Sequence, residues 1–290
     1  MNEPLFRPPA EADSLILQID RGCPHNRCTF CGMYRAVPYR RGSLDAIHAL
    51  VHREARRFPT ARRVFLADGD VMVRPFEELD TILTWLGEAL PSLTRVGLYA
   101  NGSSIMAKSD GELQELRRRK LHTLYMGLES GDDEILKACG KRETAAAMVD
   151  AGIRAQAAGL RMSVMILTGL GGTERSAAHV EHTAGALNRM RPRLLSALRV
   201  IPVEGTALFA AAANGRFAPL TEAQAVRELR ELVARLDLSG TVFRANHASN
   251  VMPLEGRLPH DKERLLAEMD ALLRSGRLDE QSPGRLPLWL

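Results

Sequence analysis

Three of the chain's four cysteines, Cys23, Cys28 and Cys31, lie within nine residues in the segment 21–34, RGCPHNRCTFCGMY. Thiolates spaced this closely favour a soft metal ion or an iron–sulfur cluster. A closed zinc or cluster site takes four protein ligands, so three cysteines leave one coordination position open for a group that is not protein. We therefore predict a metal centre with an open position in this loop.

The elements that position this loop alternate between strands and helices. The apolar run 14–20 leads into the loop and is typical of a buried strand. Five further strands are predicted over residues 63–70, 94–101, 122–130, 161–172 and 194–206. Helices are predicted over residues 44–58, 76–90, 112–120, 132–139, 144–158, 174–190, 221–236 and 260–275, with a short strand at 241–246.

Six strand–helix units imply an α/β fold with a parallel sheet. A closed barrel of this type needs eight units, so we expect an open sheet or a partial (βα)6 TIM-like barrel. The predicted organisation is an N-terminal arm at 1–13, the barrel at 14–206, and a short C-terminal helical extension at 207–290 that packs on the barrel.

Polar residues and glycines follow every predicted strand. In parallel βα folds, chemistry collects at the carboxyl ends of strands, so these positions form one candidate site. After the cysteine loop they are Asp68, Gly69 and Asp70, then Asn101, Glu129 and Ser130, the run 168–172 with Gly169, Gly171 and Gly172, and Arg199.

These residues resemble the radical S-adenosylmethionine (radical SAM) superfamily over about residues 14–205. The resemblance rests on the three-cysteine loop, on Phe30 in a C-T-F-C run like that of methylthiotransferase-like members, and on GLESGDDEIL at 127–136. The family's usual loop has three residues between its first two cysteines, whereas this chain has four, giving C-x4-C-x2-C. The variant spacing is similar to that of an uncharacterised subgroup near MiaB, NifB and Elp3.

The resemblance implies a partial (βα)6 barrel that binds a [4Fe–4S] cluster and SAM. The family cleaves SAM reductively into methionine and a 5′-deoxyadenosyl radical, which abstracts hydrogen from a substrate. By the family's pattern, residues 68–70 would bind the SAM amino group, and Glu129 and Ser130 its ribose or methionyl carboxylate. The glycines of 169–172 would let the backbone approach the adenine, and Asn101 and Arg199 would also contact the cofactor.

The implied partners are an external reductant such as flavodoxin or ferredoxin and a small-molecule or anionic substrate that the sequence does not identify. The absence of an appended RNA-binding module argues against stand-alone tRNA recognition. Residues 21–63 hold ten arginines against Asp45 and Glu54, a patch that could meet RNA phosphates. A solvated helix face is favoured, because no aromatic residues interleave with the arginines.

Alternatives remain open at several of these positions. His25 could complete a Cys3His zinc site. Cys139 could be a fourth ligand or a hydrogen-atom donor, although a small apolar residue at a helix end is favoured. Asp68 and Asp70 could simply form a turn, and Glu129 could pair with Arg161 or Arg199.

The segment 246–250 is a weak candidate for the substrate mouth. His247 could exchange a proton there and Asn246 could line the site, but a loop satisfied by its own Asn turns explains them equally well.

Composition places the chain among ordinary globular proteins, with 290 residues, 45% hydrophobic and 26% charged, and a formal charge of +4. No apolar run reaches the ~18 residues that span a bilayer, and the N-terminus does not resemble a signal peptide. We therefore expect no membrane contact and a cytoplasmic location, where thiols stay reduced. The rival function is a non-enzymatic zinc or iron–sulfur protein that binds metal or transfers electrons.

Overall fold

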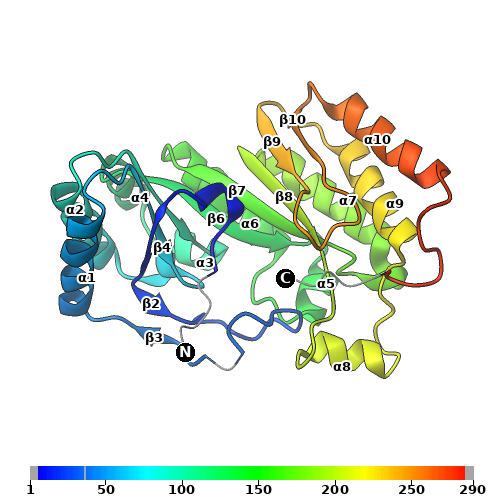
Figure 1. The fold of residues 1–290 in the computed structure, drawn as a ribbon, viewed down its shortest axis with the longest axis horizontal. Coiled ribbons are helices and arrows are strands. Elements are labelled where there is room, and N and C mark those ends of the chain that lie inside the picture. Colours follow the sequence, from blue (N-terminus) through cyan, green and yellow to red (C-terminus); the bar gives the residue numbers. More distant parts are fainter. Residues whose placement is uncertain (1–5, 36, 285–290) are drawn as a thin grey trace. The chain divides into compact units, whose positions relative to one another are not determined.

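The computed structural model describes residues 6–35 and 37–284. Within them, eight strands form a sheet in the order β1–β4–β5–β6–β7–β8–β9–β10, and β2 and β3 form a separate ribbon (Figure 1). The strands are β1 Leu15–Gln18, β2 Asp20–Arg21, β3 Arg40–Arg41, β4 Arg63–Ala67, β5 Arg95–Tyr99, β6 Leu121–Glu129, β7 Arg161–Thr168, β8 Leu194–Arg199, β9 Thr241–Arg244 and β10 Glu255–Leu258.

The helices alternate with these strands along the chain. They are α1 Leu44–Arg57, α2 Phe76–Ala89, α3 Gly102–Met106, α4 Asp110–Arg118, α5 Asp133–Ala138, α6 Ala145–Ala157, α7 Gly172–Met190, α8 Ala207–Ala213, α9 Glu222–Arg235 and α10 Lys262–Arg274, with 3-10 turns η1 Pro9–Glu11 and η2 Val71–Val73. No helix in the described ranges is long and apolar enough to cross a membrane.

The described residues divide into two compact units. Unit 1 takes them from Met1–Asn26, Met33–Met126 and Asp150–Met162, and unit 2 from Arg27–Gly32, Gly127–Val149 and Ser163–Leu290. The cysteine loop is therefore shared, with Cys23 in unit 1 and Cys28 and Cys31 in unit 2.

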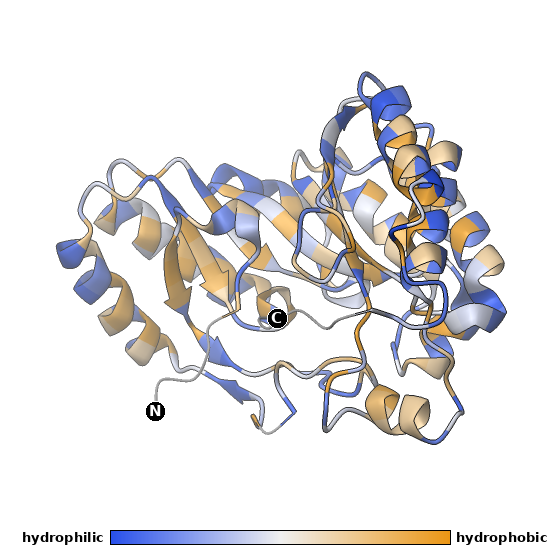
Figure 2. Cartoon of the chain, turned by 45° about the vertical axis from the view of Figure 1, so that its right-hand side comes forward, coloured by the Kyte–Doolittle hydropathy of each residue, from blue (hydrophilic) through white to orange (hydrophobic). Residues whose placement is uncertain are grey.

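Unit 1 is built on parallel strands whose carboxyl ends are in register. Gln18 at the end of β1 pairs with Ala67 at the end of β4, and Leu66 pairs with Leu98 in β5. Phe65 and Ala67 of β4 form a buried cluster with Tyr125 of β6, and Figure 2 shows hydrophobic residues along strands of this unit. This register brings the segments that follow β1, β4 and β5 to one edge.

Helix α1 shows why the sequence folds locally as predicted. Ser43 caps it by accepting a hydrogen bond from the Ala46 N–H. Its buried residues Ile47, Val51 and Ala55 recur at helical spacing and therefore share one face.

Unit 2 continues with β7, β8 and β9 in parallel and β10 antiparallel to β9. Thr168 at the end of β7 pairs with Arg199 at the end of β8, so residues 169–172 and 200–206 leave the same edge. Helix α9 packs against α7 and α10, and its Thr221–Gln224 capping box starts it at the predicted position.

The expected α/β fold with a mostly parallel sheet is confirmed, and all six predicted strands are present. The C-terminal extension holds the expected helices α9 and α10 and the expected short strand β9, and α8 and β10 add a helix and a strand that the sequence did not predict. The sequence of β10, EGRL, does not alternate clearly and three of its residues are at least partly exposed, as is common for an edge strand. The expected boundary at residue 206 stays a prediction.

Candidate metal and cofactor site

Among the described residues, Cys23, Cys28 and Cys31 form no disulfide, and all three are partly exposed. Within the described residues, no three Cys, His, Asp or Glu side chains already stand as a ligating group. What the loop can bind therefore depends on the residues that surround each cysteine in its own unit.

In unit 1, Gly69 lies directly against Cys23. The Gly69 N–H donates to the Gly22 carbonyl at 3.2 Å. A Cβ added to Gly69 would lie 2.6 Å from the Cβ of Cys23, closer than side chains approach. The turn after β4 thus needs a glycine where it meets the cysteine loop, and the structure brings these two predicted residues together.

Asp68 is buried, and its carboxylate is occupied by the cysteine loop. It accepts hydrogen bonds from the Gln18 amide at 2.8 Å, the Gly22 N–H at 3.0 Å and the Tyr34 hydroxyl at 3.2 Å. Gly22 precedes Cys23 and Tyr34 follows Cys31, so one carboxylate fixes both ends of the loop. Burial raises the pKa of Tyr34, and the negative charge of Asp68 adds to the rise. The acceptors offered to a SAM amino group at this turn would then be backbone carbonyls.

Asp70 and Asn101 also come together, as the sequence predicted for residues after neighbouring strands. The Asn101 side-chain amide donates to Asp70 Oδ2 at 3.1 Å, and the Ser104 hydroxyl donates to Asp70 Oδ1 at 3.0 Å. Sequence reasoning missed Ser104, although its spacing from Asn101 is that of a capping box.

In unit 2, Cys28 and Cys31 sit on a tight turn held from three directions. The Cys31 N–H donates to the Cys28 carbonyl at 3.2 Å, and the Thr29 N–H donates to the Cys139 carbonyl at 2.8 Å. Phe30 packs against the buried cluster of Ile135, Cys139 and Leu170. The aromatic residue before the last cysteine therefore anchors the turn in an apolar pocket.

Cys139 behaves as the apolar residue that the sequence favoured. It is buried in that cluster, and its thiol donates to the Leu136 carbonyl at 3.2 Å. Burial raises the pKa of Cys139 to about 11, which makes the thiolate form scarce.

Glu129 is paired with Lys141, not with Arg161 or Arg199 as the alternative interpretation held. The Lys141 ammonium donates to Glu129 Oε1 at 3.4 Å and to the Gly127 carbonyl at 2.6 Å, and the two side chains are only 8% and 10% exposed. Burial raises the pKa of Cys28 to about 12, and the charge of Lys141 opposes that rise. Sequence reasoning missed Lys141, because only the fold places it beside the cysteine turn.

Ser130 is fully buried and belongs to an internal network. Its hydroxyl lies 2.8 Å from His179 Nδ1 and accepts the Asp132 N–H at 3.0 Å. Asp132 caps α5 and pairs with Arg175 at 2.8 Å and His182 at 3.1 Å. These contacts hold the start of α5 against α7, and the expected contact of Ser130 with SAM stays a prediction.

The glycine-rich turn after β7 is required by packing inside unit 2. Gly169 has a φ of +81° and donates its N–H to Glu228 Oε1 at 2.5 Å. A Cβ on Gly171 would lie 2.8 Å from Ile135, and one on Gly172 would lie 2.8 Å from the Ala218 carbonyl. The expected approach of this backbone to adenine remains a prediction.

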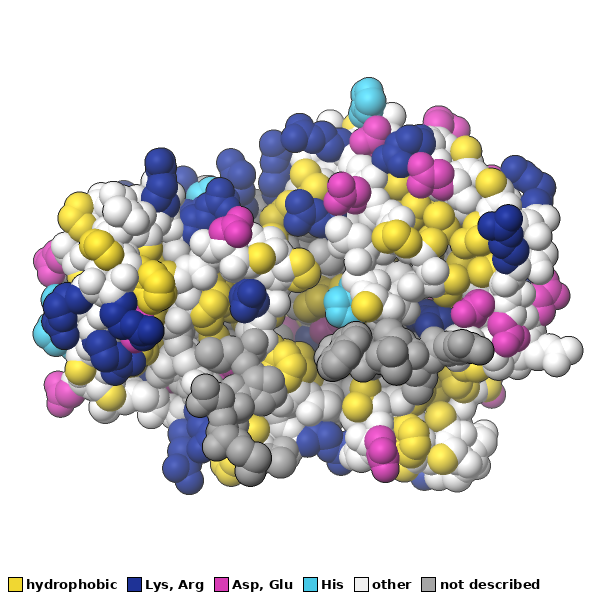
Figure 3. All heavy atoms as spheres, viewed as in Figure 1, with side chains coloured by type: hydrophobic (Ala, Val, Ile, Leu, Met, Phe, Trp, Pro, Cys, Tyr) yellow, Lys and Arg dark blue, Asp and Glu magenta, His cyan; other side chains and the backbone are white. Residues whose placement is uncertain are grey.

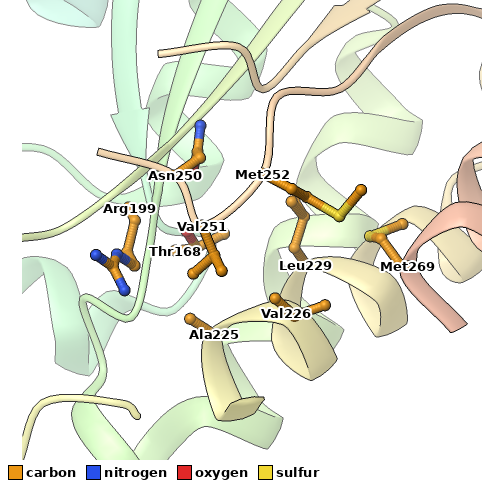
Figure 4. A pocket seen from close by; sticks show the side chains of 9 residues that line it. All are labelled: Thr168, Arg199, Ala225, Val226, Leu229, Asn250, Val251, Met252 and Met269. Atoms are coloured by element: carbon orange, nitrogen blue, oxygen red, sulfur yellow. The ribbon is translucent and has the colours of Figure 1, made fainter. Parts of the chain in front are cut away.

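Arg199 lies beside a recess of about 270 Å³ that is lined mainly by apolar side chains (Figure 4). Its Nε donates to the Ser249 carbonyl at 2.8 Å and its Nη1 to the Pro283 carbonyl at 2.9 Å. Burial lowers the pKa of Arg199. Two donors of the guanidinium therefore hold loops, and its expected contact with the cofactor stays a prediction.

The 246–250 segment is satisfied by local contacts, as its turn interpretation expects. His247 Nδ1 lies 2.8 Å from the Ser249 hydroxyl, and the Asn250 amide donates to the carbonyls of Ala197 and Ala245. The Asn246 amide lies 3.4 Å from Glu255. Nothing in this geometry assigns His247 or Asn246 a catalytic role.

The arginine-rich surface of unit 1 is partly neutralised. Arg53 and Arg57 pair with Glu54, and Arg41 pairs with Glu78. Figure 3 shows basic and acidic side chains side by side at the left of the view, where α1 lies. This arrangement fits the solvated helix face favoured from the sequence.

The family model described as the Radical SAM superfamily matches residues 17–184, and no curated protein sequence matches. Among solved structures, the chain is similar to methylornithine synthase (PylB), with a TM-score of 0.54 and 16% identity, covering 89% of this chain and 81% of that one. It is also similar to coproporphyrinogen III oxidase (HemN) from Escherichia coli, with a TM-score of 0.57 and 16% identity over 76% of this chain and 51% of that one. For Elp3 from Methanocaldococcus infernus the TM-score is 0.55 and the identity 15%, over 78% and 59%.

At these identities the solved structures show the fold alone, and they confirm the expected partial barrel architecture. The matched segment contains all three clustered cysteines, strands β2 to β7 and the end of β1. It covers more than half of the sequence. The chain therefore belongs to the radical SAM superfamily.

Proposed function

We propose that Cys23, Cys28 and Cys31 hold the [4Fe–4S] cluster of a radical SAM enzyme that abstracts a hydrogen atom from a small or anionic substrate. Enzymes of this superfamily use such a cluster and SAM, and these are the cofactors of the chain. When bound, the reduced cluster supplies one electron that cleaves SAM into methionine and a 5′-deoxyadenosyl radical.

The observation that carries the proposal is the Cys28–Cys31 turn. Its two thiols are partly exposed and form no disulfide, its backbone is held by Cys139 and Phe30, and the buried Lys141 cation opposes the rise that burial causes in the pKa of Cys28. Thiolates are the donors that iron–sulfur clusters take. The residues therefore fit the group that the family implies.

In unit 1, Asp68 contributes by holding the residues that flank the cysteines. The backbone carbonyls of the 68–70 turn can then accept hydrogen bonds from an ammonium, while Asp70 is oriented by Asn101 and Ser104. The burial of these side chains keeps water from competing for the same groups.

An external one-electron reductant is required by the family's chemistry, and flavodoxin or ferredoxin suits that role. The rival function, a zinc or iron–sulfur protein without catalysis, has no support in the family match. The neutralised arginines of α1 favour a small substrate over nucleic acid.

The test is anaerobic reconstitution with iron and sulfide. We expect about four irons and four sulfides per chain and release of 5′-deoxyadenosine from SAM with dithionite. Cys28→Ala should abolish cluster assembly, whereas the matched variant Cys139→Ala should leave the iron content unchanged because Cys139 only packs. Tight stoichiometric zinc without SAM cleavage would contradict the proposal.

A further inference from the structure

The segment 139–141, which follows α5, runs directly against the cysteine turn of unit 2. The Cys139 carbonyl accepts the Thr29 N–H at 2.8 Å. A Cβ added to Gly140 would lie 2.8 Å from the Arg27 carbonyl oxygen and 3.9 Å from the Cα of Cys28. Gly140 also has a φ of +75°, so glycine suits this position in both conformation and space.

This backbone crossing places Lys141 beside Cys28. Lysine is almost never buried without a partner, and the side chain of Lys141 is only 8% exposed. Its ammonium carries three donors, and two of them have acceptors among the described residues, the Gly127 carbonyl and Glu129 Oε1. The third N–H of the ammonium can donate to a sulfur atom, or to an anion that is bound to that sulfur.

Burying this ion pair is costly, since both groups lose their water. Glu129 adopts a left-handed conformation with a φ of +62°, which is uncommon for a residue with a side chain. The salt bridge is 3.4 Å long, and the Gly127 carbonyl holds the same ammonium at 2.6 Å. The charge of the buried cation also acts on Cys28, where it opposes the rise that burial causes in the pKa of the thiol.

A cluster held by three thiolates is anionic and gains another negative charge on reduction, and its reduction potential depends on nearby charge and hydrogen bonds. We propose that Lys141 is a positioning residue of the cluster site, a buried cation that stabilises the reduced cluster and is oriented by Glu129 and Gly127. The inference rests on the proposed function, because it assumes a cluster on Cys28.

The test compares the wild type with Lys141→Met, Lys141→Arg and Lys141→Gln, with Lys137→Met as control. Lys137 lies in the last turn of α5 but is exposed. Each protein is reconstituted anaerobically, its iron and sulfide are counted, and the cluster is titrated without SAM while its electron paramagnetic resonance signal is recorded.

We expect Lys141→Met to fill with iron but to show a tenfold lower ratio of reduced to oxidised cluster at the wild-type midpoint, a shift of 59 mV for one electron. Lys141→Arg and Lys137→Met should stay at the wild-type midpoint. If the Lys141→Met protein does not assemble a cluster, the midpoint is measured on Lys141→Gln, which is also neutral and whose amide can still donate to the Gly127 carbonyl.

An unchanged midpoint in a fully loaded neutral variant would overturn the inference, as would a shift seen only when SAM is added. Failure of the wild type to take up iron or to cleave SAM would instead overturn the proposed function.

Discussion

Glu228 and His179 form a buried pair in unit 2 whose pKa shifts oppose each other. Their side chains are 1% and 0% exposed, and His179 Nε2 lies 3.8 Å from Glu228 Oε1. The Ser130 hydroxyl accepts the Asp132 N–H, so its proton can be donated to His179 Nδ1. His179 is then neutral, and the proton on Nε2 faces Glu228.

Burial raises the pKa of Glu228 from 4.5 to about 7 and lowers the pKa of His179 from 6.5 to about 4. The folded state binds the Glu228 proton more tightly than the unfolded state does. The stability that this group contributes is therefore lost as pH rises, by roughly 2–3 kcal/mol between pH 5 and pH 8. The unfolded state binds the His179 proton more tightly than the folded state does. The contribution of His179 to the free energy of unfolding therefore increases by about 2 kcal/mol over the same pH interval. In the wild type the two effects nearly cancel.

When either group is removed, the free energy of unfolding should show the pH dependence of the group that remains. In Glu228→Gln the free energy of unfolding should increase by about 2 kcal/mol from pH 5 to pH 8, and in His179→Asn it should fall by roughly 2–3 kcal/mol. Asparagine is chosen because its amide oxygen can accept the Ser130 hydroxyl. The assay is anaerobic urea unfolding at pH 5, 6.5 and 8, followed by circular dichroism. Parallel pH dependence in the two variants would refute the reasoning.

Two further predictions concern unit 1. Gly69→Ala should lose most of its iron on reconstitution, because the added Cβ would lie 2.6 Å from the Cβ of Cys23. Gly87→Ala, where nothing lies within 4 Å, should retain its iron and gain up to about 1 kcal/mol in urea unfolding; equal iron in both variants would contradict the close-approach argument. Arg74→Met should lower the free energy of unfolding by about 3–5 kcal/mol, because the fully buried Arg74 pairs with the buried Asp20. A loss below about 1 kcal/mol would show that the pair is dispensable.

The strands and most helices were predictable because their signals are local. Apolar runs marked the six strands, and caps such as Ser43 and the Ser109–Glu112 capping box marked helix starts. The helices and strands that the sequence missed are short: β2, β3, α3, α8 and β10. Of these, α8 is an alanine-rich helix of seven residues, and β10 is a polar edge strand. Strand β10 forms because it pairs with β9, and this pairing is a tertiary contact that the local sequence does not show.

The candidate site was only partly predictable from sequence. The sequence predicted that residues following neighbouring parallel strands lie close together, and in the structure Gly69 lies against Cys23 and Asp70 beside Asn101. Sequence reasoning could not tell which atoms of these residues are already used. The sequence placed residues 68–70 at the amino group of the cofactor, and the structure adds that the Asp68 carboxylate holds the protein's own loop. The sequence did not single out Lys141, because the charge of this lysine matters only when its side chain is buried, and burial cannot be read from the sequence.

The four-residue gap between Cys23 and Cys28 acquires a physical explanation from Asn26. Asn26 has a φ of +44°, a left-handed conformation that asparagine tolerates better than most residues, and its side-chain amide donates to the Tyr34 carbonyl at 2.8 Å. Tyr34 is itself bound by Asp68 through its hydroxyl. The longer gap therefore contains a turn that ties the middle of the loop back to its own end, immediately before the chain passes into the Cys28–Cys31 turn. A three-residue gap would have to omit or displace this turn, so the extra residue gives the loop a brace of its own.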